Sequence, residues 1–387
     1  MSVTERNSER WPTLTFGPVE TALRVELRSW LSSHAPEPPS GTYESAVREL
    51  IDWQAALHAA GFMGLSWPSQ YGGRGLSLAA EAVLAEELAT TAMPELINRL
   101  ALYTWGPTIL AHGTEEQREC FLPGMLDASE IWCQGFSEPA AGSDLAAVSM
   151  SGAVGADRLV LNGQKVWTSR AELSKWNALL VRTDADAPRR AALSVVVVDM
   201  QSPGIVVRPL LQMLHEPHFS EVFFDGVEVP TANVLGGIGN GWEIAMRAMS
   251  YERGLFVLER STRLRRRLSE LGRRLSERAD GGEVAARFGV LCAELESLRA
   301  HVYQTLDQQA SGTLRPGATS IDKLLLTYAD ENLFGTAYDV LGPEASLCDD
   351  GWTHDLLVSR SVGIYSGTSE IQRNIIARQL LGLSRGA

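Results

Sequence analysis

Residues 360–382 read RSVGIYSGTSEIQRNIIARQLLG, and the rest of the chain is best understood from this stretch. A corner of small residues, 366–369, separates an apolar lead-in from a segment whose apolar residues recur at helical spacing. Ser369 followed by Gln372 is typical of a capping box, so we expect a helix that begins at the corner and stops at Gly382. Such a corner can present backbone N–H groups to a phosphate or a carbonyl oxygen, although a plain turn before a terminal helix explains the same residues.

The composition bounds the kind of protein. The 387 residues are 45% hydrophobic and 21% charged, which is enough to bury a large core in two or three structural units. A net charge of −13 argues against general nucleic-acid binding. The first residues are polar and no apolar run reaches the roughly 18 residues of a membrane span, so we expect a cytoplasmic protein.

Cysteine and lysine usage adds two expectations. The four cysteines lack any regular metal-binding spacing and are expected to be reduced, mostly buried thiols: Cys120, Cys133, Cys292 and Cys348. Lysine occurs only at positions 165, 175 and 323, which we interpret as compositional bias rather than function. Six arginines between positions 263 and 274 are expected to form a solvated helix face.

The periodicity of apolar residues changes twice along the chain. Residues 1–130 indicate an all-α domain, with helical spacing over 19–31, 43–60, 78–88 and 108–121. Short apolar runs separated by turn residues predict an antiparallel β domain over 131–236, in which Asn162-Gly163 is the clearest hairpin turn. Residues 237–387 are helical again and predict a four-helix-bundle-like domain. The fold class is therefore α+β with three domains, and the glycines of 233–241 do not fit a dinucleotide-binding fold.

Several segments, in the correct order, resemble the acyl-CoA dehydrogenase family of flavoproteins. They are WPSQYGGRG at 67–75, SEPAAGSD at 137–144, KVWTS at 165–169 and GTSEIQRNIIAR at 367–378. The resemblance implies the three-domain fold, FAD as cofactor, and an acyl-CoA or acyl-carrier-protein substrate. It also implies an electron-transfer flavoprotein as partner and a homo-oligomer, either a dimer or a tetramer.

The resemblance also assigns residues to FAD and to the acyl carrier. Phe136 and Ser137 would lie at the flavin pyrimidine edge, Trp167 beside the ring and Ser169 near N5. On its own, a tryptophan on a strand is more often a half-buried core residue. The remaining implied contacts are Thr368, Glu370 and Gly342 with FAD, and Ser143 with the pantetheine or phosphate of the carrier. The flavin-diphosphate segment Q-x-L-G-G reads DVLGP at 339–343, so this chain departs from the family there.

The catalytic base is displaced from the position that many family members use. Removal of the weakly acidic α-proton of a thioester requires a carboxylate, which many members place immediately before G-T-S. That position is Ser366 here, and only its backbone N–H is expected to serve, by polarising the thioester carbonyl. Other members carry the base in an L-x-x-E-R context, which MSYERG at 249–254 resembles. Glu252 is thus the predicted base and Arg253 a predicted substrate contact, whereas an ordinary exposed Glu-Arg pair is the plain alternative.

These residues favour FAD-dependent α,β-dehydrogenation of an acyl thioester. Two alternatives stay open: a flavin monooxygenase or oxidase on the same scaffold, and a non-catalytic subunit of a heteromeric dehydrogenase.

Overall fold

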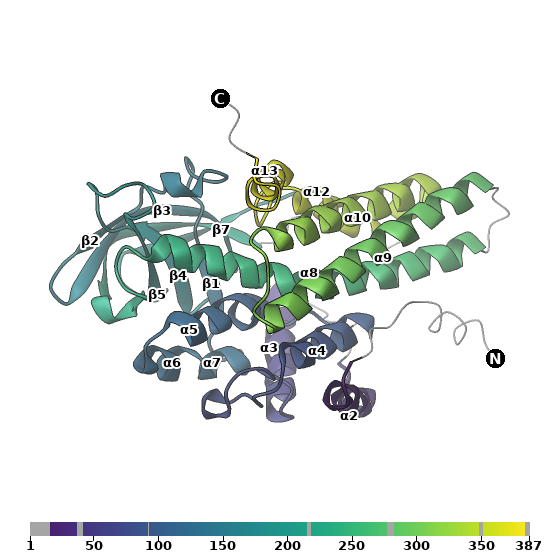
Figure 1. Cartoon of the computed structure of the whole chain (residues 1–387), viewed down its shortest axis with the longest axis horizontal. Helices are drawn as coiled ribbons and strands as arrows, with labels where there is room; N and C mark the ends of the chain where they lie inside the picture. The colour runs from purple at the N-terminus through teal and green to yellow at the C-terminus, as the bar shows by residue number, and fades with distance from the viewer. Residues whose placement is uncertain are drawn as a thin grey trace.

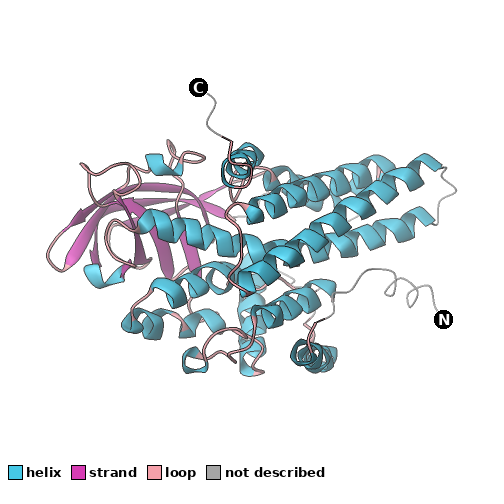
Figure 2. Cartoon of the chain, in the orientation of Figure 1, coloured by secondary structure: helices cyan, strands magenta, loops and turns pink. Residues whose placement is uncertain are grey.

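The chain folds into a helical N-terminal part, a middle sheet and a C-terminal set of long helices (Figures 1 and 2). This computed structural model describes residues 16–36, 42–91, 93–214, 218–276, 282–347 and 351–383. In Figure 1 the sheet lies to the left, the N-terminal helices below and the long helices to the right. The predicted fold class is confirmed.

The N-terminal part contains six α-helices among the described residues. They are α2 (Pro18–His34), α3 (Tyr43–Ala59), α4 (Leu78–Thr90), α5 (Gly106–His112), α6 (Glu115–Phe121) and α7 (Pro123–Leu126), with a short 3-10 turn, η1 (Ser69–Tyr71). The segment 108–121, expected to be a helix and a connector, contains the end of α5 and the whole of α6, because Gly113 and Thr114 divide it. Thr114 and Gln117 form a capping box that starts α6.

A widened turn precedes α5. Residues 99–100 are helical and lead into η2 (Ala101–Trp105), which has π-helical hydrogen bonding. Pro107 follows immediately, and its ring would clash with a carbonyl in a regular α-helix, so the wider turn accommodates it. Gly106 cannot carry a side chain, since a Cβ there would lie 2.1 Å from the Trp67 ring.

The middle part is one eight-stranded sheet. Its strands are β1 (Trp132–Gly135), β2 (Ser151–Val154), β3 (Arg158–Ser169), β4 (Trp176–Arg182), β5 (Leu193–Asp199), β6 (Ile205–Leu210), β7 (Phe219–Pro230) and β8 (Val234–Leu235). Seven of them follow the order β6-β7-β3-β2-β4-β5-β8, and β1 pairs with β4 in parallel. The other extended pairings are antiparallel.

The predicted hairpin turn at Asn162-Gly163 is wrong. Both residues lie inside β3, where the pairing with β7 shifts register between Leu161 and Gly163. The Asn162 side chain accepts a hydrogen bond from Gly226 N at 2.8 Å, and Gly163 has φ +141°. The asparagine and glycine therefore form a β-bulge. The sequence pattern of this bulge resembles that of a hairpin turn.

The C-terminal part is built around one long helix. It contains α8 (Gly241–Ser276), α9 (Gly282–Ala310), α10 (Ala318–Leu341), α11 (Glu344–Leu347), α12 (Trp352–Val362) and α13 (Ser369–Gln379). Helix α8 packs against β5, α4 and η2 as well as α9 and α10. Its middle turns therefore lie where the three parts of the chain meet.

Two expectations about surface residues are corrected. Five of the six arginines between 263 and 274 are half-buried, and only Arg273 is exposed. Three of the five, Arg263, Arg267 and Arg274, form ion pairs with acidic residues of neighbouring turns and helices. Of the cysteines, Cys133 is buried but Cys120 is exposed, and Cys348 lies outside the described residues.

Within the described ranges, no helix is long and apolar enough to cross a membrane.

Candidate functional site

The corner before α13 is tighter than its sequence suggested. Ser366 and Gly367 both adopt left-handed backbone conformations, with φ of +53° and +89°. Thr368, rather than Ser369, caps the helix, since its hydroxyl accepts a hydrogen bond from Ile371 N at 3.3 Å. The predicted capping box is wrong because the Gln372 amide turns back to donate to the carbonyl oxygens of Ser366 and Gly367, at 2.8 and 3.3 Å.

The corner meets the middle of α8 through a side-chain contact. The Ser366 hydroxyl donates a hydrogen bond to Oε1 of Glu252. Both residues are half-buried. The structure thus brings together two residues that the sequence assigned to one site, and it does so through the serine hydroxyl, which sequence reasoning left without a role.

A buried lysine supports the same corner from α10. Lys323 is 2% exposed, its ammonium donates to the Val362 carbonyl at the end of α12, and it lies 4.6 Å from the centre of the Tyr365 ring. Burial lowers the pKa of Lys323 to about 8, although the Glu252 carboxylate acts in the opposite direction. Sequence reasoning missed this residue, and the rarity of lysine was the signal that could have found it.

Arg253 points toward the start of α10. Its Nε donates to Thr319 Oγ1 at 3.3 Å. Burial lowers the pKa of the guanidinium, and the carboxylates of Glu252 and Asp322 oppose that effect.

A second buried lysine, Lys165 in β3, holds the segment that follows β1. Lys165 donates to Glu138 Oε1 at 2.8 Å and to the carbonyls of Phe136 and Leu180 at 3.2 and 2.6 Å. Burial lowers the pKa of this lysine to about 8, and Glu138 opposes the shift. The conformation of Phe136 and Ser137 therefore depends on a lysine and a glutamate that the sequence showed only as parts of motifs.

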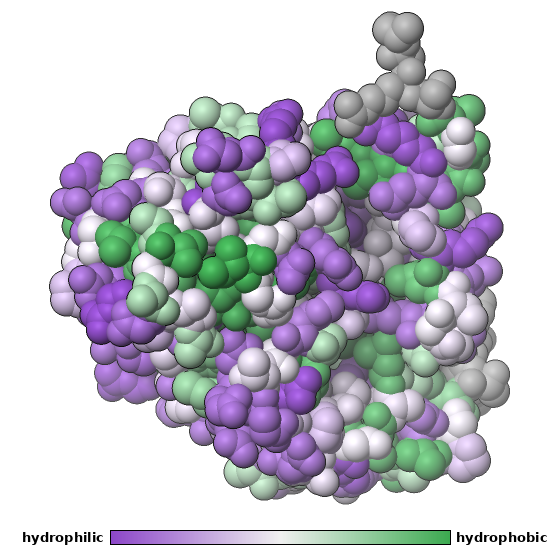
Figure 3. Space-filling model, turned by 60° about the vertical axis from the view of Figure 1, so that its left-hand side comes forward, coloured by the Kyte–Doolittle hydropathy of each residue, from purple (hydrophilic) through white to green (hydrophobic). Residues whose placement is uncertain are grey.

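The sheet presents an uncovered indole near the end of β3. Trp167 is 58% exposed, has φ +61° at a second irregularity of β3, and meets Phe219 edge-on at 6.0 Å. Neither Ser137 nor Ser169 has a side-chain hydrogen bond within the described residues. Figure 3, with the sheet domain turned forward, shows an apolar patch and a hollow on the face of the molecule in view. Ser143 is exposed in the loop between β1 and β2.

Charged residues of the segment before η2 meet α8 about two turns after Glu252. Arg99 pairs with Glu95 at 2.7 Å and lies 3.5 Å from Glu259. Burial lowers the pKa of Arg99, but the two carboxylates outweigh burial and hold it above the ordinary value. Burial also raises the pKa of Glu95, yet Arg99 and Arg263 outweigh it and lower that pKa to about 2. Glu95 and Arg99 are therefore both charged at neutral pH.

Two predicted cofactor residues lie apart from these contacts. Glu370 is exposed and pairs with Arg373 at 3.4 Å, and hydrogen bonds from its own backbone N–H and from the Thr368 hydroxyl lower its pKa. Gly342 follows the end of α10, roughly 30 Å along that helix from Lys323. Within one chain the structure does not bring Gly342 to the corner.

Sequence models of one family match all three parts of the chain. The acyl-CoA dehydrogenase N-terminal domain matches residues 18–129, the middle domain 133–227 and the C-terminal domain 239–381. The chain belongs to the acyl-CoA dehydrogenase family. The predicted family and class of enzyme, an oxidoreductase acting on CH–CH bonds, are thereby confirmed.

This acyl-CoA dehydrogenase is similar to proteins of mycobacterial origin. It is 38% identical to the acyl-CoA dehydrogenase IpdE1 of Mycobacterium tuberculosis, over 94% of this chain and 98% of that protein. The ChsE4-ChsE5 complex from the same species has a TM-score of 0.83 at 26% identity, covering 97% of this chain and all of the other. The prolyl acyl carrier protein oxidase AnaB has the same fold, with a TM-score of 0.84 at 22% identity, over 95% of this chain and all of AnaB.

The residues of the dehydrogenase fit a flavin. Members of the family are FAD-dependent, and the prediction of FAD is confirmed. An isoalloxazine ring needs an apolar surface for its plane and donors for its polar edge. The exposed Trp167 indole offers the first, and the Ser137 and Ser169 hydroxyls offer the second.

Proposed function

We propose that this dehydrogenase forms an α,β-double bond in an acyl thioester and that Glu252 takes the proton from Cα. The observation that carries the proposal is the hydrogen bond from Ser366 to Glu252. It holds a carboxylate at the corner where many family members place their own glutamate. FAD, when bound, supplies the acceptor for the hydride that leaves Cβ.

The corner serves the same reaction by binding charge that develops on the substrate. As Glu252 removes the α-proton, negative charge grows on the thioester oxygen, and a fixed N–H donor stabilises it. We assign this donor to the Ser366 backbone, which the left-handed turn and the Gln372 amide hold in one orientation. Arg253 would act next to the substrate through its charge, because its Nε is already engaged by Thr319.

Contacts with the cofactor and the carrier are proposals of the same kind. Phe136, Ser137, Trp167, Ser169 and Thr368 would hold the flavin ring. Glu370, which is exposed in the first turn of α13, and Gly342, which lies away from the corner, would contact FAD only at its outer parts or in a neighbouring copy of the chain. Ser143, exposed on its loop, would contact the carrier, which we propose is CoA or an acyl-carrier protein.

The test of the base is Glu252→Gln, which keeps the size and hydrogen-bonding capacity of the side chain. We expect the variant to retain FAD but to lose anaerobic bleaching of the flavin absorbance when acyl thioesters are added. Glu243→Gln is the matched control, since Glu243 is an exposed carboxylate in the first turn of the same helix. Bleaching of the Glu252→Gln protein at the rate of the control would refute the assignment.

A different reaction on this scaffold is the second candidate. Its support is the fold shared with the prolyl acyl carrier protein oxidase. A reduced and aerated sample that forms peroxide stoichiometrically, or a hydroxylated product, would favour an oxidase or monooxygenase. Rapid electron transfer to an electron-transfer flavoprotein, with slow reaction toward oxygen, would favour the dehydrogenase.

We also propose that the chain acts in the cytoplasm as an oligomer. Copies of this chain alone would form a dimer or tetramer through the C-terminal helices. A chain that binds no FAD when expressed alone, and binds it only with a second subunit, would instead indicate a member of a heteromeric dehydrogenase.

A further inference from the structure

Two aromatic rings and a guanidinium lie close together beside the turn of α8 that follows Glu252. Phe256 follows Glu252 by one turn of α8 and therefore lies on the same face of that helix. Its ring meets the ring of Tyr365, the residue before Ser366, edge-on at 6.3 Å. The Arg99 guanidinium lies 5.2 Å from the centre of the Phe256 ring. Arg99 is thus on the order of 10 Å from the proposed base.

Arg99 is surrounded by other residues, but part of its side chain is still exposed to solvent. It retains 22% of its side-chain surface and its partner Glu95 retains 36%, although both lie deep among other groups. Two polar atoms beside it have no hydrogen-bond partner within the described residues, namely Glu259 Oε2 and the Tyr103 hydroxyl. Tyr103 belongs to the π-helical turn η2 and is 5% exposed.

These charges disfavour a purely hydrocarbon acyl tail. A methyl end placed against Arg99 and Glu95 would remove water from both charges and give no hydrogen bond in return. An oxygen atom on the tail would accept a hydrogen bond from the guanidinium, and the Phe256 and Tyr365 rings would cover the carbon skeleton between that oxygen and the thioester.

We propose that the substrate of this dehydrogenase carries a carbonyl or carboxylate oxygen at the far end of its acyl group, and that Arg99 binds this oxygen. The inference rests on the proposed function, because it takes Glu252 to mark the position of Cα. Arg99 would then determine specificity without taking part in the chemistry.

The test measures binding separately from turnover. Glu252→Gln holoenzyme is titrated anaerobically with hexanoyl-CoA, adipoyl-CoA and 5-oxohexanoyl-CoA, and perturbation of the flavin absorbance gives each Kd. We expect at least one oxygenated thioester to bind about 10-fold more tightly than hexanoyl-CoA. A preference for adipoyl-CoA identifies a carboxylate end, and a preference for 5-oxohexanoyl-CoA identifies a neutral carbonyl. Equal or tighter binding of hexanoyl-CoA overturns the inference.

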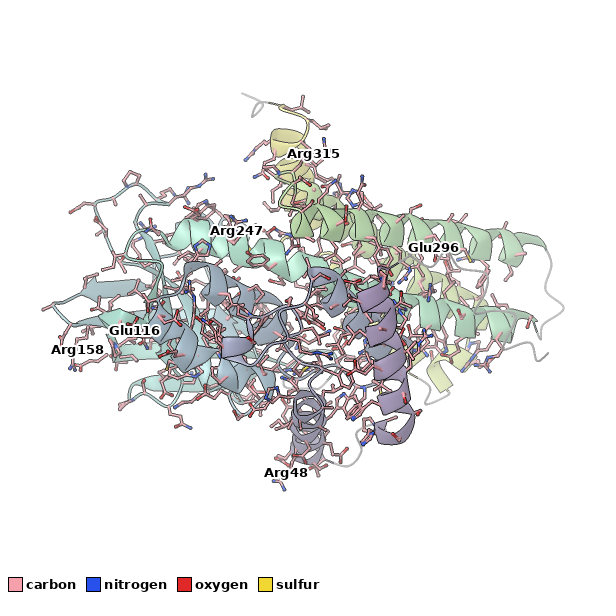
Figure 4. The ribbon with its side chains drawn as sticks, turned by 60° about the horizontal axis from the view of Figure 1, so that its bottom comes forward. Arg48, Glu116, Arg158, Arg247, Glu296 and Arg315 are labelled. Carbon is pink, nitrogen blue, oxygen red and sulfur yellow. The ribbon has the colours of Figure 1, made fainter. Side chains whose placement is uncertain are left out.

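Three further variants, each made in the Glu252→Gln protein, test whether Arg99 is the residue that prefers oxygenated thioesters. Arg99→Met removes the guanidinium but keeps its apolar length, and we expect it to abolish the preference. Arg158→Met is the control, because that arginine pairs with Glu228 at the outer end of the sheet domain (Figure 4). Glu95→Gln, at a more accessible position, removes a competing carboxylate and should tighten the binding of adipoyl-CoA. A preference that survives Arg99→Met overturns the role of Arg99.

Failure of this inference is distinguishable from failure of the proposed function. If hydrocarbon and oxygenated thioesters bleach the unaltered enzyme equally while Glu252→Gln is inert, the base is correct and the tail contact is wrong. If Glu252→Gln still bleaches, the base is wrong whatever the three Kd values are.

Discussion

The Ser366 hydroxyl donates a hydrogen bond to Glu252 Oε1 and so joins residues 114 positions apart in the sequence. A hydrogen bond to a carboxylate restricts its orientation and is stronger than one between neutral groups. Removal of the hydroxyl would therefore leave the carboxylate free to turn away from the α-proton.

For Ser366→Ala we expect flavin bleaching by substrate to slow by about 10- to 100-fold, because the carboxylate is no longer held in line with the α-proton. Stopped-flow absorbance measures the rate. Ser361→Ala is the control, since its hydroxyl bonds to the Val358 carbonyl inside α12 and is not part of the corner. Faster bleaching by Ser366→Ala would show that the hydroxyl restrains the base rather than positions it.

Comparison of Ser366→Gly with Ser366→Ala isolates the backbone strain of the corner. Both variants lack the hydroxyl, but only alanine retains a Cβ at a φ of +53°. We expect the glycine variant to be more stable than the alanine variant by about 1 kcal/mol, since the left-handed conformation disfavours a Cβ. Thermal unfolding of the two FAD-bound proteins side by side measures the difference. Equal midpoints would mean that the corner relaxes when the hydroxyl is lost.

The buried Lys165 predicts a pH-dependent stability. Its pKa is lowered from 10.5 to about 8, so between these values the unfolded chain holds a proton that the folded chain has released. The free energy of unfolding therefore gains a contribution that increases from pH 8 toward 10.5. In Lys165→Met this contribution is absent, whereas the similar one from Lys323 remains. We expect the stability difference between the unaltered protein and the variant to grow between pH 7.5 and 9.5 in denaturant titrations, and a constant difference would contradict the assignment.

We predict that replacement of Trp167 weakens FAD binding but leaves the fold intact. The indole is largely exposed, so Trp167→Ala should leave the stability of the FAD-free protein within about 0.5 kcal/mol. Its removal uncovers one side of the flavin, and we expect the Kd for FAD to rise about 10-fold. Val206→Ala, which truncates another exposed apolar residue of the sheet, should change neither value. Unchanged FAD affinity in Trp167→Ala would show that Trp167 does not belong to the flavin site.

Element types and order were predictable from the sequence because long periodic segments determine them. Helices α8, α9 and α10 lie in the region 237–387 that was expected to be helical, and the strands lie in the region 131–236 where short apolar runs predicted them. Local signals failed where tertiary contacts reassigned them. Asn162-Gly163 forms a bulge because β7 pairs across it, and Gln372 turns to the corner carbonyls instead of the cap.

Of the site, the sequence predicted the residue types but not their partners. Glu252 and Ser366 were assigned to one reaction, yet no pattern within the sequence could show that one side chain bonds to the other. In the sequence, the two buried lysines stand out only because lysine is rare in this chain. Their role follows from the several hydrogen bonds that an ammonium donates to carbonyl oxygens arriving from separate segments, and sequence spacing does not record these.

The position of Ser366 in the chain has a consequence for biosynthesis. Residues are added from the N-terminus, so α8 and its Glu252 are made well before the corner that orients this carboxylate. The sheet and the first helices can fold while the carboxylate still lacks its partner, because their contacts lie within earlier segments. Competence for chemistry is therefore acquired last, when Ser366 reaches α8.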